Sequence, residues 1–191
     1  MRIGVLSLQG AFAEHIQVLR ELDVEATEVR LPSQLENIDG LIIPGGESTT
    51  ISKLMQSFNL MQSVSEMARS GLPIMGTCAG MILLARDTSD DNLETLQVMD
   101  IEVRRNAFGR QVDSFEVDIS MPVLGEEPFH AVFIRAPILA KVNISAEVLA
   151  SLPDGTPVAA RQGKLLACAF HPELAQDPRF HRYFLDIVAS G

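Results

Sequence analysis

A lone cysteine stands between two glycines, Gly76 and Gly80, where the sequence passes from one structural pattern to another. Before Cys78 the apolar pair at 74–75 predicts a short buried strand, and after it the apolar spacing over 79–85 predicts a helix. A sharp strand-to-helix turn strains the backbone of its central residue, and flanking glycines let neighbouring main chain approach without a Cβ clash. The pattern G-x-C-x-G therefore predicts that Cys78 lies at a nucleophile elbow.

Such an elbow would activate the Cys78 thiol. The unsatisfied N–H groups at the start of the following helix favour negative charge on the sulfur. The N–H of Ala79 would also point to the place where an oxyanion develops. The alternative is structural, because free cysteine is among the most buried residue types. This segment alone leaves both interpretations open.

A histidine and a glutamate, His171 and Glu173, follow directly on a predicted strand over 165–170. The proline between them biases its predecessor toward extended backbone, in which residues two apart point to the same side. A carboxylate beside one ring nitrogen would fix the tautomer and stabilise the imidazolium, so the other nitrogen could take the proton of a thiol. A solvated turn after a strand is the alternative.

A glycine pair follows another predicted strand, in the segment P-G-G-E-S-T-T at 44–50. Ligands bind at such strand ends in open α/β sheets, and paired glycines let backbone N–H groups form an anion-receiving nest. Ser48, Thr49 or Thr50 is predicted to cap the helix that follows. A phosphate loop is disfavoured because no lysine follows the glycines at the required spacing. A simple turn with a helix cap remains the alternative.

Strands and helices alternate through the first half of the chain, which predicts an α/β three-layer sandwich, a mostly parallel sheet with helices on both faces. From Leu96 onward, short alternating stretches predict an added antiparallel or mixed strand region. The predicted elements are strands at 2–8, 24–29, 40–43, 101–103, 115–119 and 131–134, helices starting at Phe12, near Ile51 and near Leu60, a polar loop at 86–92, a hairpin over 158–170 turning at Gln162-Gly163, and a last helix capped by Asp177 with Pro178 in its first position.

The remaining histidines and the second cysteine carry weaker signals. His15 and His181 are predicted on helix surfaces and His130 in a turn before a strand, none of them with a partner carboxylate. Cys168 is predicted as a core strand residue. Two cysteines and four histidines, scattered as they are, have neither the number nor the spacing of a disulfide framework or a zinc site, so no metal is expected.

Composition limits the classes of function. A chain of 191 residues with 47% hydrophobic content can fill one core, so a single domain over 1–191 is predicted. A net charge of −10 argues against nucleic acid or an anionic membrane as the partner. The first apolar run is too short for a signal peptide, and no stretch approaches the ~18 apolar residues of a membrane span. A cytoplasmic protein is therefore expected.

The three motifs gain weight together. If the sheet is parallel around them, the elbow cysteine, the His-x-Glu pair and the glycine turn all lie at the same edge of the sheet. A nucleophile, a base and an orienting carboxylate at one edge are the arrangement that acyl transfer through a thioester requires.

At this point the chain resembles the class I, triad-type glutamine amidotransferases, which share a G-x-C-x-G elbow and a His-Pro-Glu and have a flavodoxin-like fold. It looks most like the family of glutaminase subunits of pyridoxal 5′-phosphate synthase, the PdxT/SNO family. The segments that carry the resemblance are Gly4-Val-Leu-Ser-Leu-Gln-Gly10, Glu14-His15, Pro44-Gly-Gly-Glu-Ser-Thr-Thr50, Gly76-Thr-Cys-Ala-Gly80, Arg105-Asn-Ala-Phe-Gly-Arg-Gln-Val-Asp-Ser-Phe-Glu116, Phe133-Ile-Arg-Ala-Pro137 and Phe170-His-Pro-Glu-Leu174.

The resemblance implies that the chain hydrolyses L-glutamine to L-glutamate and ammonia without a cofactor. Cys78 would attack the carboxamide, with His171 as acid and base and Glu173 as its orienter. Guanidinium groups suit the carboxylate of an amino acid. By resemblance, glutamine is bound by Gly46, Glu47, Ser48, Arg105, Ile134 and Arg135, and the backbone N–H groups of Gly46 and Ala79 form the oxyanion hole.

The resemblance also implies a partner. Ammonia would pass to a separate synthase subunit, a (β/α)₈ barrel of the PdxS/SNZ type that makes pyridoxal 5′-phosphate. In the family, the free glutaminase is poorly active until this partner docks near the turn at Gln9-Gly10 and the oxyanion hole is completed. One departure is Gln97, where the family pattern leads us to expect glycine. The rival hypotheses are a glutaminase subunit of imidazole glycerol phosphate synthase, a cysteine hydrolase of the same fold and a non-catalytic binding module.

Overall fold

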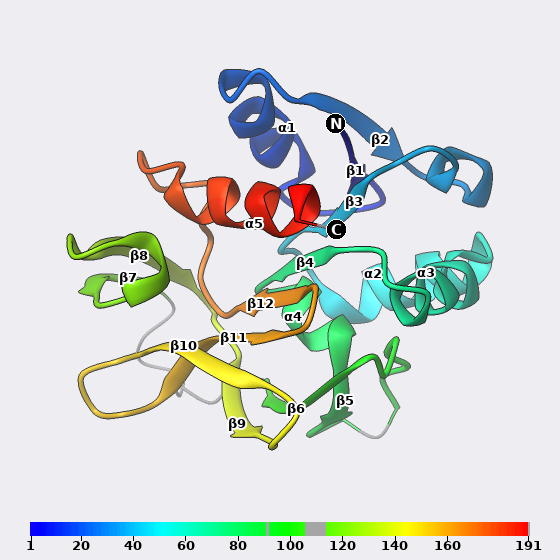
Figure 1. Ribbon diagram of the computed structural model, residues 1–191. Helices are drawn as coiled ribbons and strands as arrows, with labels where there is room; N and C mark the ends of the chain where they lie inside the picture. The colour runs from blue at the N-terminus through cyan, green and yellow to red at the C-terminus, as the bar shows by residue number, and fades with distance from the viewer. Residues whose placement is uncertain (91, 106–113, 191) are drawn as a thin grey trace.

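A seven-stranded sheet with helices on both faces forms the centre of the molecule (Figure 1). The computed structural model describes residues 1–90, 92–105 and 114–190. The strand order in this sheet is β10-β11-β12-β4-β3-β1-β2. Its strands are β1 (Arg2–Leu6), β2 (Glu25–Val29), β3 (Gly40–Ile43), β4 (Ile74–Thr77), β10 (Glu147–Ser151), β11 (Pro157–Gln162) and β12 (Leu165–Cys168).

Five of these strands run parallel, which decides where the three motifs meet. β2, β1, β3, β4 and β12 pair in parallel, while β11 pairs antiparallel with both β12 and β10. The register sets Ile43 opposite Gly76 and Thr77 opposite Cys168. Consequently the segments that follow β3, β4 and β12 all leave the sheet at one edge, as the sequence predicts.

The helices cover the two faces of the sheet. On one face lie α1 (Phe12–Glu21) and α5 (Arg179–Ala189), and on the other lie α2 (Ser48–Ser57), α3 (Leu60–Arg69) and α4 (Ala79–Leu84) (Figure 1). Packing is close where glycines face a helix: a Cβ on Gly40 would lie 2.9 Å from Val188 of α5. The predicted three-layer α/β fold is therefore confirmed. Within the described residues, no helix is long and apolar enough to cross a membrane.

The added strand region is also present. β5 (Ala85–Thr88), β6 (Met99–Arg104) and β9 (Ile138–Val142) form a three-stranded mixed sheet, and β7 (Ser114–Ile119) pairs antiparallel with β8 (Phe129–Ile134). Two short 3₁₀ helices, η1 (Pro32–Leu35) and η2 (Pro122–Leu124), complete the elements. The polar loop predicted over 86–92 is partly wrong, because its first residues belong to β5.

Three local predictions need correction. The cap of α2 is Glu47, whose carboxylate accepts the N–H groups of Thr49 at 3.1 Å and Thr50 at 2.7 Å, so none of the predicted hydroxyl residues is the cap. The hairpin between β11 and β12 turns at 163–164, one residue late, since Gln162 pairs with Leu165.

The last helix also starts one residue later than predicted, at Arg179, with Pro178 as its cap residue. Asp177 still receives the N–H of Arg179 at 3.0 Å, which is the interaction expected of a capping aspartate. At Gln97, the position where the family pattern suggests glycine, φ is 53°. That left-handed conformation favours glycine, so the side chain here is carried at a local conformational cost.

Candidate active site

The elbow at Cys78 has the strained geometry that its sequence predicts. β4 ends at Thr77, α4 begins at Ala79, and Cys78 between them has φ 49° and ψ −103°. Such a backbone persists only where its surroundings hold it. The Cys78 N–H donates to the carbonyl of Cys168 at 2.8 Å, so the neighbouring strand β12 fixes the turn.

The two flanking glycines are required by close packing. A Cβ on Gly80 would lie 1.9 Å from the carbonyl oxygen of Ile43, and a Cβ on Gly76 would lie 2.6 Å from the carbonyl group of Gly80. Real Cβ atoms do not approach backbone so closely, so any side chain at either position would push α4 away from the sheet. The close approach predicted from G-x-C-x-G is confirmed.

His171 and Glu173 meet after β12. Glu173 Oε1 lies 2.7 Å from His171 Nδ1, and both side chains are at least nine-tenths buried. The main-chain N–H of His171 donates to the main-chain carbonyl of Val132 at 2.8 Å, which connects this segment to β8. The extended backbone around the proline thus brings imidazole and carboxylate together as the sequence predicts.

The cysteine and the histidine come together beside the glycine turn. A Cβ built on Gly45 would lie 2.4 Å from His171 Cε1 and 3.2 Å from Cys78 Cβ. Burial lowers the pKa of His171, but hydrogen bonding with the Cys78 sulfur and with Glu173 outweighs it and raises the pKa to about 10. His171 is therefore protonated at neutral pH and can hold a thiolate as an ion pair.

The glycine turn is held by three hydrogen bonds from other segments. The Gly45 N–H donates to Thr77 Oγ1 at 3.1 Å, and its carbonyl receives the Ala11 N–H at 3.0 Å. The Glu47 N–H donates to Gln9 Oε1 at 2.7 Å. The turn after β1 and the end of β4 thus fix the backbone of 45–47 next to the sulfur.

A cavity of about 420 Å³ opens in front of Cys78. All the residues assigned to glutamine or oxyanion binding line it, with the exception of Ile134, whose carbonyl lies 3.9 Å from Cys78 Sγ. Sequence reasoning did not assign three further lining residues, Gln9, Ile82 and Pro137, although Gln9 and Pro137 belong to quoted motifs. The lining residues are Gln9, Gly46, Glu47, Ser48, Cys78, Ala79, Ile82, Arg105, Arg135 and Pro137.

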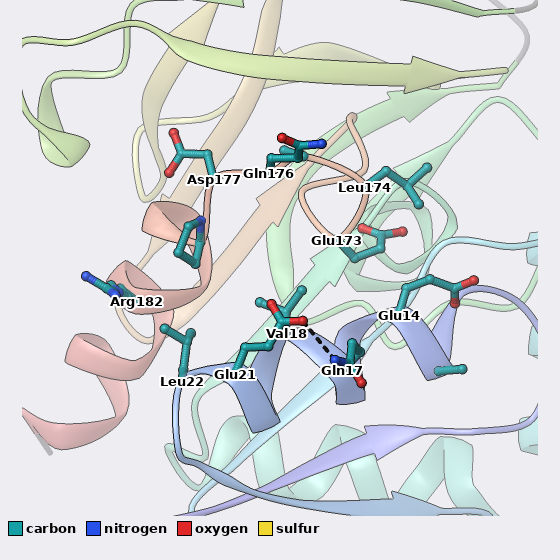
Figure 2. A pocket seen from close by; sticks show the side chains of 13 residues that line it. Glu14, Gln17, Val18, Glu21, Leu22, Glu173, Leu174, Gln176, Asp177 and Arg182 are labelled. Atoms are coloured by element: carbon teal, nitrogen blue, oxygen red, sulfur yellow. Dashed lines mark hydrogen bonds between the residues drawn. The ribbon is translucent and has the colours of Figure 1, made fainter.

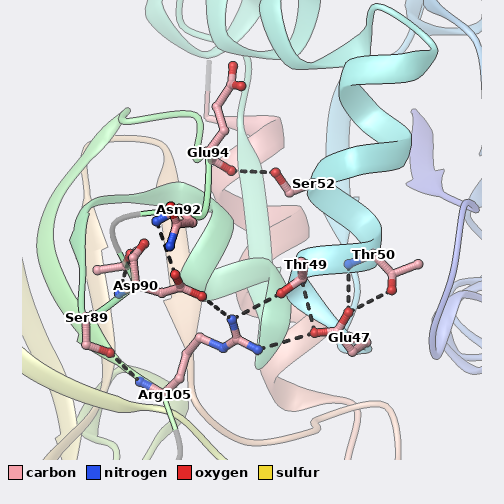
Figure 3. A network of polar contacts seen from close by, with 10 residues as sticks. Glu47, Thr49, Thr50, Ser52, Ser89, Asp90, Asn92, Glu94 and Arg105 are labelled. Atoms are coloured by element: carbon pink, nitrogen blue, oxygen red, sulfur yellow. Dashed lines mark hydrogen bonds and ion pairs between the residues drawn. The ribbon is translucent and has the colours of Figure 1, made fainter.

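Arg105 is already engaged by acidic partners at the rim of this cavity (Figure 3). Its guanidinium donates to Asp90 at 2.8 Å and to Thr49 Oγ1 at 3.1 Å, and forms an ion pair with Glu47 at 3.3 Å. Burial raises the pKa of Glu47, but hydrogen bonds from Thr50 and Thr49 lower it overall. A bound carboxylate would therefore share or replace these partners. Residues 106–113 of the motif that starts at Arg105 lie outside the described part of the chain.

A larger hollow of about 760 Å³ lies between α1 and the segment that follows Glu173 (Figure 2). Acidic side chains such as Glu14, Glu21 and Asp177 line it together with Arg182. Cys78 does not line this hollow. We therefore place the candidate chemistry in the smaller cavity in front of Cys78, although this hollow is larger.

Two histidines expected at the surface are buried, so that prediction is wrong. His15 and His181 are 0% exposed, and His15 Nδ1 lies 2.9 Å from His181 Nε2. His15 Nε2 lies 3.2 Å from Thr77 Oγ1 and 3.3 Å from Glu173 Oε2. The helix spacing could have found His15, because it falls on the same buried face of α1 as Ile16 and Leu19.

The prediction for His130 is wrong as well. It lies within β8, not in a turn, and its ring nitrogens are 2.8 Å from Asp118 and 2.9 Å from Glu116 of β7. Cys168 is fully buried in β12, as predicted, and burial raises the pKa of its thiol. In the ranges that the structure describes, no group of three His, Cys, Asp or Glu side chains could hold a metal ion.

Comparison with known proteins gives the class first. A solved structure described as a glutamine amidotransferase is 48% identical and superposes with a TM-score of 0.93 over 98% of each chain. The structure of PurLQS from Thermotoga maritima, 14% identical, shares the fold alone, with a TM-score of 0.72 over 97% of each chain. The fold is therefore that of class I glutamine amidotransferases.

The sequence comparisons narrow the class. Residues 5–190 match the model of the SNO glutamine amidotransferase family. The pyridoxal 5′-phosphate synthase subunit PdxT of Moorella thermoacetica is 61% identical over 98% of this chain and 100% of its own, and that of Herpetosiphon aurantiacus is 60% identical over the same shares. The chain belongs to the SNO glutamine amidotransferase family.

Proposed function

We propose that this chain, as a single domain over residues 1–191, is the glutaminase subunit of a pyridoxal 5′-phosphate synthase. It hydrolyses L-glutamine to L-glutamate and ammonia and supplies the ammonia to a synthase subunit. One observation carries the proposal: Cys78, the His171–Glu173 pair and the glycine turn converge beside a 420 Å³ cavity in a chain 61% identical to a protein named as that subunit.

The first half of the reaction forms a thioester. The Cys78 thiolate, paired with protonated His171, attacks the side-chain carboxamide carbon of glutamine, and the carbonyl electrons move onto the oxygen. Backbone N–H groups of Gly46 and Ala79 receive that oxyanion, the second one at the start of α4. When the tetrahedral intermediate collapses, the C–N bond breaks and His171 donates its proton to the leaving nitrogen, which departs as ammonia.

The second half regenerates the thiol. His171, now neutral, removes a proton from water as the water oxygen attacks the thioester carbon. Collapse of this intermediate breaks the C–S bond, releases glutamate and returns the thiolate–imidazolium pair. Glu173, 2.7 Å from Nδ1, keeps the other ring nitrogen facing the sulfur and stabilises the imidazolium in both halves.

Glutamine binding uses the rim of the same cavity. We assign it to Gly46, Glu47, Ser48, Arg105, Ile134 and Arg135, with no cofactor. Ile134 would act through its main chain, since its carbonyl lies near the sulfur while its side chain is 40% exposed. Arg105 would receive the α-carboxylate in exchange for part of its present contact with Asp90.

The relatives are named as subunits of pyridoxal 5′-phosphate synthase, which supports a synthase subunit as the partner of this chain. We propose that it is a (β/α)₈ barrel of the PdxS/SNZ type and that the two subunits form a hetero-oligomer in the cytoplasm. No nucleic acid or membrane takes part. A glutaminase subunit of imidazole glycerol phosphate synthase is the alternative, and activation by that synthase would identify it.

The test is a glutaminase assay with and without the candidate synthase subunit. We expect glutamate release that rises when the partner is added and that disappears in Cys78→Ala. Release that is unchanged by the partner, or that persists in Cys78→Ala, would refute the proposal.

A further inference from the structure

A buried pair of histidines lies directly behind the candidate carboxylate. His15 comes from α1 and His181 from α5, on the face of the sheet opposite α4. A polar group in such a place is strongly destabilising unless it is hydrogen-bonded. His15 nevertheless meets polar atoms from three different elements, His181, Thr77 and Glu173, and this indicates a specific network.

Both rings of the pair are neutral at neutral pH. Burial, followed by the nearby charges of His181 and His171, lowers the pKa of His15 well below its usual value. Burial lowers the pKa of His181 to about 4. Each ring therefore carries a single N–H, and the position of that hydrogen decides what the ring offers to its neighbours.

The contacts select one pair of tautomers. If His15 donated from Nδ1, its bare Nε2 would face the Glu173 carboxylate at 3.3 Å, and His181 would bury an unpaired N–H at Nδ1. If His181 instead donates from Nε2 to His15 Nδ1, the Nδ1 of His181 is an acceptor without a donor among the described residues. His15 then carries its own hydrogen on Nε2. The second arrangement avoids both penalties and leaves the N–H on His15 Nε2, which lies 3.2 Å from Thr77 Oγ1, its hydrogen-bond partner, and 3.3 Å from Glu173 Oε2.

The carboxylate needs that donor. Glu173 Oε1 is paired with His171 at 2.7 Å, but Oε2 is buried and has no hydrogen bond of ordinary geometry within the described residues. Nε2 of the neutral His15 ring lies 3.3 Å from Oε2. Catalytic hydrogen bonds are often long in the unliganded state and tighten with substrate, and a small ring movement would close this one.

We propose that His15, with its tautomer set by His181, is a positioning residue that holds the ionised Glu173 carboxylate against His171. The proposal rests on the proposed function, because it assumes that the His171–Glu173 pair serves Cys78. His15 also lies beside Thr77, which receives the N–H of Gly45 at 3.1 Å. One ring thus supports both the carboxylate and the glycine turn.

Two amide substitutions separate this role from simple packing. The amide nitrogen of glutamine reaches the place of Nε2, whereas that of asparagine reaches only the place of Nδ1. With the synthase subunit present, kcat of His15→Asn should fall about tenfold, the worth of one hydrogen bond to a charged group, with little change in KM. His15→Gln should keep most of kcat. The acid limb of the pH–rate profile should shift in His15→Asn only, because the Glu173 carboxylate then loses the donor that holds it against His171.

A second measurement does not depend on glutamine. The rate at which iodoacetamide alkylates Cys78, followed against pH with Cys78→Ala as the blank, reports the thiolate that His171 and Glu173 stabilise. The acid limb of this alkylation profile should also shift in His15→Asn and stay in place in His15→Gln. Gln17→Asn on the exposed side of the same helix controls for the lower helix propensity of asparagine.

The outcomes distinguish the two proposals. A wild-type chain that alkylates with the predicted variant pattern but does not hydrolyse glutamine would overturn the proposed function and support the role of His15. His15→Asn and His15→Gln variants with equal kcat and identical alkylation profiles would overturn the role of His15, even if the wild type is an active glutaminase.

Discussion

Two histidine–carboxylate clusters in this molecule have similar distances and opposite surroundings. His171 lies 2.7 Å from Glu173, and His130 lies 2.8 Å from Asp118 and 2.9 Å from Glu116. The side chain of Glu173 is 0% exposed, while that of Glu116 is 62% exposed. Hydrogen bonds that the His130 ring donates to Asp118 and Glu116 raise the pKa of His130, so raised basicity occurs in both clusters.

The difference teaches that pairing alone does not make a site. The buried cluster faces a cysteine on a strained elbow, and behind its carboxylate lies a second buried histidine, His15, with Nε2 3.3 Å from Glu173 Oε2. The exposed cluster has no such neighbours among the residues described, and solvent and salt screen its charges. Burial therefore distinguishes the His171–Glu173 pair, which is held beside the cysteine, from the His130 cluster, which is a surface interaction.

The largest effect should come from removing the nucleophile. Cys78→Ala should abolish glutamine hydrolysis while leaving the fold and partner binding nearly intact, since a small residue still fits the elbow. The assay is glutamate release with the synthase subunit present, and binding is measured by co-elution. Cys168→Ala is the matched control and should remain active; the reverse result would move the chemistry to the other thiol.

The base should come next. His171→Asn should lower kcat by roughly 10²- to 10⁴-fold, because proton transfer to the leaving nitrogen is lost. His130→Asn should leave kcat within about twofold, since its cluster touches no part of the cavity. Equal losses in the two variants, measured by steady-state kinetics, would remove the contrast on which the assignment depends.

The carboxylate should matter less than the base it orients. Glu173→Gln should lower kcat by about 10- to 100-fold, corresponding to one charge-assisted hydrogen bond, and by less than His171→Asn does. Glu116→Gln should have no effect on the rate. A larger loss in Glu173→Gln than in His171→Asn would show that Glu173 does not act through His171.

The pH dependence of kcat/KM should report the ionisation of His171 and not that of the exposed His130. Because the pKa of His171 is raised to about 10, the imidazolium that donates a proton to the leaving nitrogen is present below that pH and is lost above it. We expect kcat/KM to fall with an apparent pKa near 10 in wild type and in His130→Gln alike. A basic limb that moves in His130→Gln would contradict the separation of the two clusters.

The smallest expected effect is the contribution of the exposed His130 cluster to the stability of the folded protein. The folded-state pKa of His130 is raised, so its stabilising contribution is complete below the unfolded pKa and disappears as pH rises through the folded one. The urea midpoint of wild type should exceed that of His130→Gln slightly at pH 6 and match it at pH 9. Added salt should shrink the difference at pH 6, whereas a larger difference at pH 9 would contradict the sign.

Local sequence patterns were sufficient for the elements that bear the site. Strands β3, β4 and β12 are short, fully buried runs followed by glycine, cysteine or histidine motifs, so their common edge could be predicted. The G-x-C-x-G spacing also predicted backbone contacts at Gly76 and Gly80 that the structure shows. The Gly76 contact is with Gly80 of the same motif, whereas the Gly80 contact is with Ile43, which the parallel pairing of β3 with β4 brings close.

The features that were missed depend on distant partners. The contact of His15 with His181 joins residues 166 positions apart, and that of Arg105 with Asp90 depends on where β5 and β6 bring the chain. A polar residue on a helix was expected to face water. Here the two buried histidines instead form a hydrogen bond with each other. The strands β9 and β10 were also not predicted, because their patterns are short and half-exposed.

The central claim is that Cys78 is a nucleophile activated by His171. The most direct measurement is the rate of covalent labelling by a diazoketone analogue of glutamine, followed by intact mass and peptide mapping. We predict one adduct on Cys78, whose formation is slowed by competing glutamine, is much slower in His171→Asn and proceeds at the normal rate in His130→Asn. Labelling at another residue, or equal rates in wild type and His171→Asn, would contradict the account.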